Sequence, residues 1–359
     1  MNRQLEKNLG DLEERIDPQE EERLLQKWVE FSEDRFTGDV FSPHRRRPSP
    51  PKTEWPVISV NNALQSFERM ALYQYGDCSA KLATGSGSLL NVRPNFGSSI
   101  IPLLFGTKPF VMPEEANTLP GAVPLGDGDA IRRLVDAGVP DIHKGYADQV
   151  FQTAVYYREL ARKFPKIGRY VYIYHPDFQG PMDICEIVWG SQFFYALYDE
   201  PDLVKAFLEI ITQTYSRLMH EWLSIVPARR EGNAHWGLFH KGTIMLRDDS
   251  AMNLSPDMFD EFVRPYDQRL LDEFGGGAIH FCGRGDHYIA RMSTIRGLHA
   301  INLTQPDYNH METIFCHTVD KGIKLIGLPP TGVETALRDG RDLRGQVHVG
   351  VADQRRLRP

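Results

Sequence analysis

The chain has 359 residues, of which 41% are hydrophobic and 25% are charged, a balance typical of a globular protein with one barrel domain or two ordinary domains. Its formal net charge of −7 gives no electrostatic case for binding nucleic acid or an anionic membrane surface. No apolar run approaches the roughly 20 residues that span a bilayer, the start of the chain is too charged for a signal peptide, and the four cysteines are widely spaced, so we expect a cytoplasmic protein with reduced thiols.

Residues 1–56 are expected to form a helical extension followed by a proline-rich connector. Apolar residues recur at helical spacing over Leu5–Ile16 and again over Leu24–Phe31. Five prolines between residues 43 and 56 then favour an extended segment. The face that carries Trp28 could pack on the core domain or on a second copy of the chain, so a homodimer is one hypothesis.

From residue 57 onward, strand-like and helix-like segments alternate about eight times, which is the pattern of a parallel α/β fold. The expected strands are Leu89–Val92, Arg169–Tyr174, His235–His240 with Thr243–Leu246, Ala278–Cys282, His299–Leu303, Ile323–Leu328 and Gln346–Val351. The expected helices are Val57–Ala80, much of 126–165, Ile184–Leu197, Pro201–Leu223, a helix capped by Ser255, Tyr288–Arg296 and Met311–Lys321. We therefore predict a single (β/α)8 TIM barrel over residues 57–359, preceded by the helical extension.

Polar side chains follow several of these strands and are candidates for a site. Arg93 could hold a carboxylate or phosphate, or it could cap a loop. Asp177 and Asp249 are catalytic candidates that could orient a cationic substrate or transfer protons, and helix capping is the alternative role for each. Gln179 and His235 are further candidates for substrate binding, although a histidine beside aromatic residues is often part of a core. Because barrel active sites form at the carboxyl ends of the strands, we expect Arg93, Asp177 and Asp249 to converge there with His280 and Cys282.

His280 and Cys282 are the most informative pair in the sequence. They lie two residues apart on an expected strand that ends at Gly283, so their side chains project from the same face. Zinc accepts both imidazole and thiolate ligands, and a functional site needs at least one ligand more. The alternative is a cysteine that packs as a small apolar residue beside a hydrogen-bonded histidine.

Three longer blocks carry a resemblance to known proteins. They are Asp177–Thr212 (DFQGPMDICEIVWGSQFFYALYDEPDLVKAFLEIIT), Ile244–Leu271 (IMLRDDSAMNLSPDMFDEFVRPYDQRLL) and Ala278–Gly283 (AIHFCG), followed by a Gly-x-x-x-x-Asn strand at Gly297–Asn302. Their order and spacing resemble the uroporphyrinogen decarboxylase superfamily, which includes the decarboxylase and the cobalamin- and corrinoid-linked methyltransferases. The resemblance implies a TIM barrel and covers roughly residues 57–351.

The resemblance also implies a metal, but the sequence departs from the family at two points. The arginine-rich Arg-Gln-Ala-Gly-Arg stretch of the decarboxylases is absent, and NVRPNFG around Arg93 is the nearest match in position. In the zinc methyltransferases, a cysteine on the last strand completes the His-x-Cys pair, whereas the last strand here reads GQVHVGVAD. His348 on that strand is the first choice for the missing zinc ligand, and Asp249 is the second.

The favoured hypothesis is a zinc-dependent, corrinoid-linked methyltransferase acting on a small molecule, with the corrinoid carried by a separate partner protein. Zinc would hold a thiol as a thiolate nucleophile, and the corrinoid would donate the methyl group. One alternative is a metal-independent decarboxylase or lyase that uses Arg93 and Asp177. The other is a non-catalytic binding protein built on the same barrel.

Overall fold

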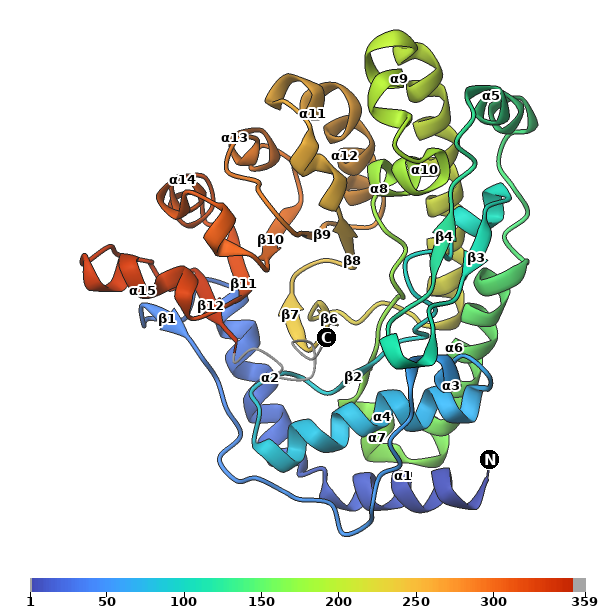
Figure 1. The fold of residues 1–359 in the computed structure, drawn as a ribbon. Coiled ribbons are helices and arrows are strands. Elements are labelled where there is room, and N and C mark those ends of the chain that lie inside the picture. The colour runs from blue at the N-terminus through green and yellow to red at the C-terminus, as the bar shows by residue number, and fades with distance from the viewer. Residues whose placement is uncertain (1, 351–359) are drawn as a thin grey trace.

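The computed structural model describes residues 2–350 and shows a mixed α/β fold in which helices surround parallel strands (Figure 1). The strands are β1 (Val40–Phe41), β2 (Asn91–Val92), β3 (Lys108–Phe110), β4 (Gly121–Val123), β5 (Tyr172–Ile173), β6 (Asn233–His235), β7 (Leu238–His240), β8 (Ile244–Arg247), β9 (Gly277–Phe281), β10 (Leu298–Leu303), β11 (Lys324–Leu328) and β12 (Val347–Val349).

The α-helices include four that are longer than four turns and several short ones. They are α1 (Arg3–Arg15), α2 (Pro18–Ser32), α3 (Val60–Ala63), α4 (Phe67–Thr84), α5 (Gly128–Ala137), α6 (Gly145–Lys163), α7 (Pro165–Tyr170), α8 (Pro181–Trp189), α9 (Phe193–Asp199), α10 (Pro201–Ile225), α11 (Pro256–Phe262), α12 (Arg264–Glu273), α13 (Ile289–Met292), α14 (Met311–His317) and α15 (Thr331–Arg338). Within residues 2–350, no helix is both long enough and apolar enough to cross a membrane.

The parallel strands form one large sheet and one small one. The large sheet has six strands in the order β1-β12-β11-β10-β9-β8, and β2 pairs with β5 in the small sheet. The neighbours β8 to β12 follow chain order because a helix returns the chain after each strand, as in a βαβ unit. Such an arrangement is consistent with a TIM-like barrel, and it places the carboxyl ends of β8, β9 and β10 side by side.

The N-terminal segment is integrated into this architecture. Strand β1 pairs in parallel with β12, with Phe41 opposite His348. Helix α1 places Leu5, Leu9 and Leu12 in the main hydrophobic core. On α2, the predicted apolar face is buried, and Trp28 packs edge-on against Phe41 with their ring centroids 5.0 Å apart. The predicted boundary at residue 57 therefore falls downstream of a strand that belongs to the sheet.

Two strand predictions were wrong in detail. Residues 169–170 are helical, because Pro165 starts α7 and this helix continues to Tyr170, so β5 is confined to Tyr172–Ile173. The segment His235–His240 is the end of an antiparallel hairpin rather than one strand, since β6 and β7 reverse at Trp236 and Gly237. The predicted Ser255 cap is confirmed: its side chain accepts a hydrogen bond from the Met258 N–H.

The β6–β7 hairpin lies between the six-stranded sheet and the β2–β5 pair (Figure 1). Ala234 and Phe239 are buried in a cluster with Trp28 and with residues of β8 to β11. The turn uses positive φ at both central residues, 52° at Trp236 and 80° at Gly237, as a two-residue hairpin of this twist requires. Glycine suits this backbone, but a bulky residue such as Trp236 is strained there.

Candidate functional site

Asp249, His280 and Cys282 come together where β8 and β9 end. The His280 Nε2 atom lies 3.4 Å from Cys282 Sγ and 3.6 Å from Asp249 Oδ1. One ligand atom from each residue lies within 4.8 Å of the other two. Asp249 also accepts a hydrogen bond of 2.6 Å from the backbone N–H of Cys282, which ties the two strand ends together. A nitrogen, a thiol sulfur and a carboxylate oxygen form a donor set that suits zinc.

The hydrogen bonds behind His280 orient its ring for metal binding. The Asn302 side-chain amide donates to the Ile326 carbonyl at 2.6 Å, so its oxygen faces His280 Nδ1 at 2.8 Å. Since an amide oxygen only accepts, Nδ1 carries the proton of the neutral ring. The lone pair of Nε2 then points toward Cys282 and Asp249, and a second-shell partner of this kind is typical of histidines that ligate metals. The residues therefore fit a bound zinc ion.

In the metal-free protein His280 already has the protonation state that a metal ligand requires, whereas Cys282 does not. Burial lowers the pKa of His280, so its ring is neutral near pH 7. Burial, followed by the negative charge of Asp249, raises the pKa of the Cys282 thiol to about 11. The thiol is therefore protonated in the metal-free protein, and a metal must displace this proton.

The cluster is partly open to solvent. The side chain of Asp249 is 46% exposed, whereas that of His280 is 11% exposed. Cys282 is half-buried, and its Sγ lies 3.2 Å from Thr304 Oγ1. A site with three protein ligands and one accessible side is the arrangement of catalytic rather than structural zinc.

The structure does not bring His348 to these three residues. Its Nδ1 accepts the Gly327 N–H at 2.9 Å, and its ring packs against Trp28 with centroids 4.5 Å apart. Among residues 2–350, the groups of three or more potential ligands do not include His348. The structure instead places the second choice, Asp249, beside His280 and Cys282.

Asp177 is the centre of a second cluster close to the first. Its carboxylate pairs with Arg93 at 3.2 Å, accepts a hydrogen bond from Gln179 at 2.7 Å and forms a close ion pair with Arg247. Burial alone would raise the pKa of Asp177, but Arg247 and Arg93 outweigh it and hold the pKa below its ordinary value. Asp177 is therefore an ionised anchor for two arginines, and it is not a proton donor at neutral pH.

Arg247 was missed by the sequence analysis. It is the last residue of β8, on the same strand face as Met245, and its side chain is only 2% exposed. Its Nη2 group has no hydrogen-bond partner in the part of the chain that the structure describes. An arginine in an otherwise apolar strand (IMLR) is the signal that could have identified it, since an arginine is almost never fully buried without a partner.

Trp236 connects the two clusters. From its strained turn, the indole ring lies under the Arg247 guanidinium, 4.8 Å from ring centroid to Cζ, and the Arg93 guanidinium is 5.9 Å away. The same ring contacts the edge of His280 with centroids 5.0 Å apart. Backbone strain is tolerated where it positions a side chain for function, so Trp236 is a further site residue that sequence alone did not indicate.

His235 lies beneath the arginines in a chain of buried histidines. His240 Nδ1 donates to the Lys241 carbonyl at 2.8 Å, which leaves its Nε2 as an acceptor for His235 Nδ1 at 2.8 Å. Nε2 of His235 is therefore unprotonated, and it is buried without a partner among the described residues. Burial and the neighbouring His175 lower the pKa of His235 well below its usual range, so this nitrogen stays an acceptor.

Three buried carboxyl groups support the site from behind. Asp183 accepts the N–H of Asp249 at 3.0 Å and the N–H of Ser250 at 2.8 Å, which fixes the loop after β8. Asp248 and Asp267 interact with each other, and no donor from another described residue reaches either carboxylate. Two facing acceptors require a shared proton. Burial accordingly raises the pKa of Asp248 well above its usual range and that of Asp267 to about 7.

The raised pKa of Asp267 gives a prediction for stability. Between roughly pH 4 and 7 the folded state holds a proton that the unfolded state has lost, so the free energy of unfolding falls as pH rises, by up to about 4 kcal/mol in total. Asp267→Asn removes this ionisation and provides an amide that can donate to Asp248. We expect the variant to melt at a higher temperature than the wild type at pH 8, with little difference at pH 5, in differential scanning fluorimetry. The exposed Asp307→Asn serves as control, and equal pH profiles for wild type and Asp267→Asn would contradict the shared proton.

The fold and the clusters together define an α/β protein with a TIM-like parallel sheet and a candidate metal centre at the strand ends. No protein-family model matches the sequence, and no curated protein matches it either. Among solved structures, a methyltransferase from Methanosarcina mazei is similar, with a TM-score of 0.63 over 91% of this chain and 92% of that chain, at 15% sequence identity. At this identity the similarity shows a shared fold.

Proposed function

We propose that this protein is a zinc-dependent, corrinoid-linked methyltransferase of the uroporphyrinogen decarboxylase superfamily, acting on a small thiol. The observation that carries the proposal is the Asp249–His280–Cys282 cluster, in which Asn302 leaves the Nε2 lone pair of His280 free. The methyltransferase of the same fold from Methanosarcina mazei supports it. We further propose that the barrel is closed between β5 and β8, because the Gly180 N–H donates to the Arg247 carbonyl at 2.7 Å and the Met245 N–H donates to His175 Nε2 at 3.1 Å.

In this proposal, Asp249, His280 and Cys282 hold the zinc ion. When bound, zinc supplies the positive charge that keeps a substrate thiol deprotonated near pH 7. The unpartnered Nη2 of Arg247 is a donor for an anionic group at the other end of the substrate. The Trp236 ring contacts both Arg247 and His280 and would form a wall between these two positions.

A bound corrinoid would supply the methyl group, and zinc held by Asp249, His280 and Cys282 would keep the accepting thiol deprotonated, with the thiol proton passing to solvent. Gln179 and Arg93 hold Asp177 and thereby the Arg247 side chain in place, so they act as positioning residues.

The test is methyl transfer from free methylcobalamin to a panel of small thiols bearing a sulfonate, a carboxylate or no charge. Loss of the methylcobalamin absorbance with formation of the thioether, detected by mass spectrometry, supports the proposal when it requires zinc. We expect anionic thiols to react faster than neutral ones, and Arg247→Met to remove this preference. Consumption of a carboxylate substrate by the metal-free protein would favour the lyase, and an inactive protein that binds thiols without zinc would favour a binding protein.

A further inference from the structure

A cavity lies toward the opposite end of the strands from the metal cluster. It has a volume of about 660 Å³. Much of its lining comes from segments that precede strands: Gly168–Val171 before β5, Val226–Glu231 before β6, and Thr243 before β8. The metal cluster follows β8 and β9, so the two sites lie toward opposite ends of β8. None of Asp249, His280 and Cys282 lines this cavity.

The charge of the cavity is unlike that of the chain as a whole. Five arginines line it, with only two glutamates and no aspartate, whereas the chain has a net charge of −7. The arginines are Arg158, Arg162, Arg169, Arg229 and Arg230, and the glutamates are Glu22 and Glu231. One of the glutamates is already neutralised, since Glu22 pairs with Arg169 at 3.1 Å. The buried ring of His175 is neutral near pH 7, because burial lowers its pKa to about 3.

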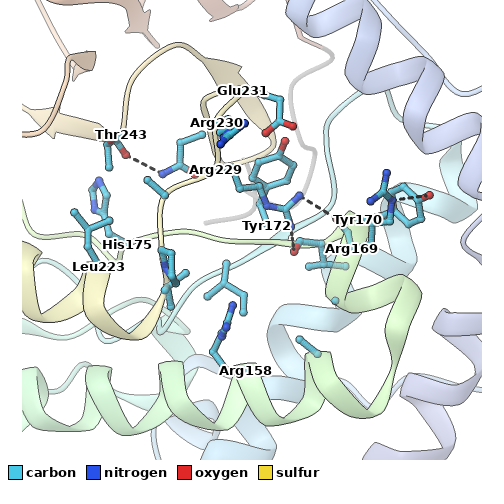
Figure 2. Close-up of a pocket in the computed structure, with 18 of the residues that line it drawn as sticks. Arg158, Arg169, Tyr170, Tyr172, His175, Leu223, Arg229, Arg230, Glu231 and Thr243 are labelled. Carbon is cyan, nitrogen blue, oxygen red and sulfur yellow. Dashed lines mark hydrogen bonds between the residues drawn. The ribbon is translucent and has the colours of Figure 1, made fainter.

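Three of the arginine side chains have no partner among residues 2–350. The guanidinium groups of Arg158, Arg162 and Arg230 form no ion pair, hydrogen bond or ring contact within this range. Arg158 is half-buried on α6 and points toward the cavity, while Arg230 lies on its far side (Figure 2). Positive charges without counter-charges therefore face the cavity from opposite sides, and an anion between them would be attracted by both.

The Arg229 side chain is held in place and gives one wall of the cavity a fixed shape. Arg229 donates to the carbonyls of Arg169 at 2.9 Å and Val171 at 3.1 Å, and its guanidinium stacks on the Tyr172 ring at 3.9 Å (Figure 2). A planar guanidinium held in this way presents its remaining N–H groups in one direction. The wall that carries it is therefore preformed, as in many ligand sites.

We infer that this cavity is a binding site for a compact polyanion, such as a diphosphate or a tricarboxylate, separate from the methyl-transfer site. Guanidinium groups bind phosphate and carboxylate oxygens in bidentate fashion, and at least three unpaired ones require a ligand with more than one negative charge. The volume lies within the range of small-molecule sites, roughly 300–1,000 Å³. The inference does not depend on the proposed function, because no residue is shared between the two sites.

Calorimetric titration of the full chain with pyrophosphate, and separately with citrate, at low ionic strength tests the inference. We expect saturable binding of one equivalent, which weakens at least about tenfold in Arg158→Gln and in Arg230→Gln. Arg133→Gln is the matched control, since Arg133 is an exposed arginine outside the cavity. The anion that binds with the higher affinity, pyrophosphate or citrate, shows whether the cavity prefers phosphate or carboxylate groups.

Two results would overturn the inference. One is the absence of binding of both anions at millimolar concentration, and the other is an equal loss of affinity in Arg133→Gln, which would indicate general charge attraction. Melting temperature and zinc content, measured on every variant, show that each is folded and has an intact metal cluster. A failed methyl-transfer assay has no bearing on this outcome, because binding is read directly.

Discussion

The zinc affinity of the metal-free protein is expected to rise about tenfold for each unit of pH between roughly 6.5 and 8.5. The pKa of Cys282 is raised to about 11, so across this window zinc must displace one proton from the thiol. The pKa of His280 is lowered, so its ring contributes no proton above its ordinary titration range. Competition with a chromophoric zinc chelator at several pH values measures this slope.

Zinc binding by a ligand variant and by a variant of a neighbouring residue should differ in its dependence on pH. Cys282→Ser should lower zinc affinity by about 100-fold or more and flatten the pH dependence, because the titrating ligand is gone. Asn302→Leu should lower affinity by about 10–100-fold but keep the slope, since the thiol remains. Cys316→Ser is the control, because Cys316 is an exposed cysteine far along the chain. Zinc affinity that is independent of pH in the wild type would contradict the assigned ligand set.

Asp177→Ala is expected to destabilise the protein by about 3–5 kcal/mol, the usual cost of leaving a buried charge without its partner. The side chains of Arg247 and Arg93 are 2% and 9% exposed, so neither can turn to solvent when the carboxylate is removed. The lower midpoint of urea-induced unfolding, followed by tryptophan fluorescence, measures the effect.

The double variant Asp177→Ala/Arg247→Met provides the decisive comparison. Removing the more buried arginine together with the carboxylate should restore part of the lost stability, giving a coupling energy of at least about 1 kcal/mol. Asp307→Ala, at an exposed position, should stay within about 0.5 kcal/mol of wild type. An Asp177→Ala protein as stable as the wild type would show that Asp177 does not neutralise the two arginines.

The parts of the site that sequence could predict are those set by local geometry. The alternation of side chains along a strand is local, and the His280 and Cys282 side chains indeed lie together, 3.4 Å apart. The identity of the third ligand depends on where β12 and the loop after β8 lie relative to His280 and Cys282. That placement is decided by contacts between distant segments, so the sequence could not rank Asp249 above His348 correctly.

Three features of the fold and the site, namely β1, Trp236 and the partner of Arg247, could not be predicted because the local sequence carries no sufficient signal for them. Strand β1 has two residues, too few for any alternation to be visible. Trp236 has no local signal, because a bulky residue with φ of 52° is against preference and is held by the packing of the hairpin. Arg247 was visible as an arginine in an apolar run, but its partner Asp177 is distant in sequence, and only the tertiary fold brings the two together.

The pairing of β1 with β12 has a consequence for biosynthesis. Val40 is synthesised about 300 residues before its partner Val347, so the edge of the sheet at β1 has no partner while the intervening chain is translated. At bacterial or eukaryotic elongation rates this interval lasts roughly 15–60 s. Throughout it, Phe41 and the apolar face of α2 have only an incomplete sheet to pack against, and an unpaired strand edge invites association with other nascent chains. The pairing of β1 with β12 can therefore form only after translation has passed β12, and until then the β1 edge is open to other strands.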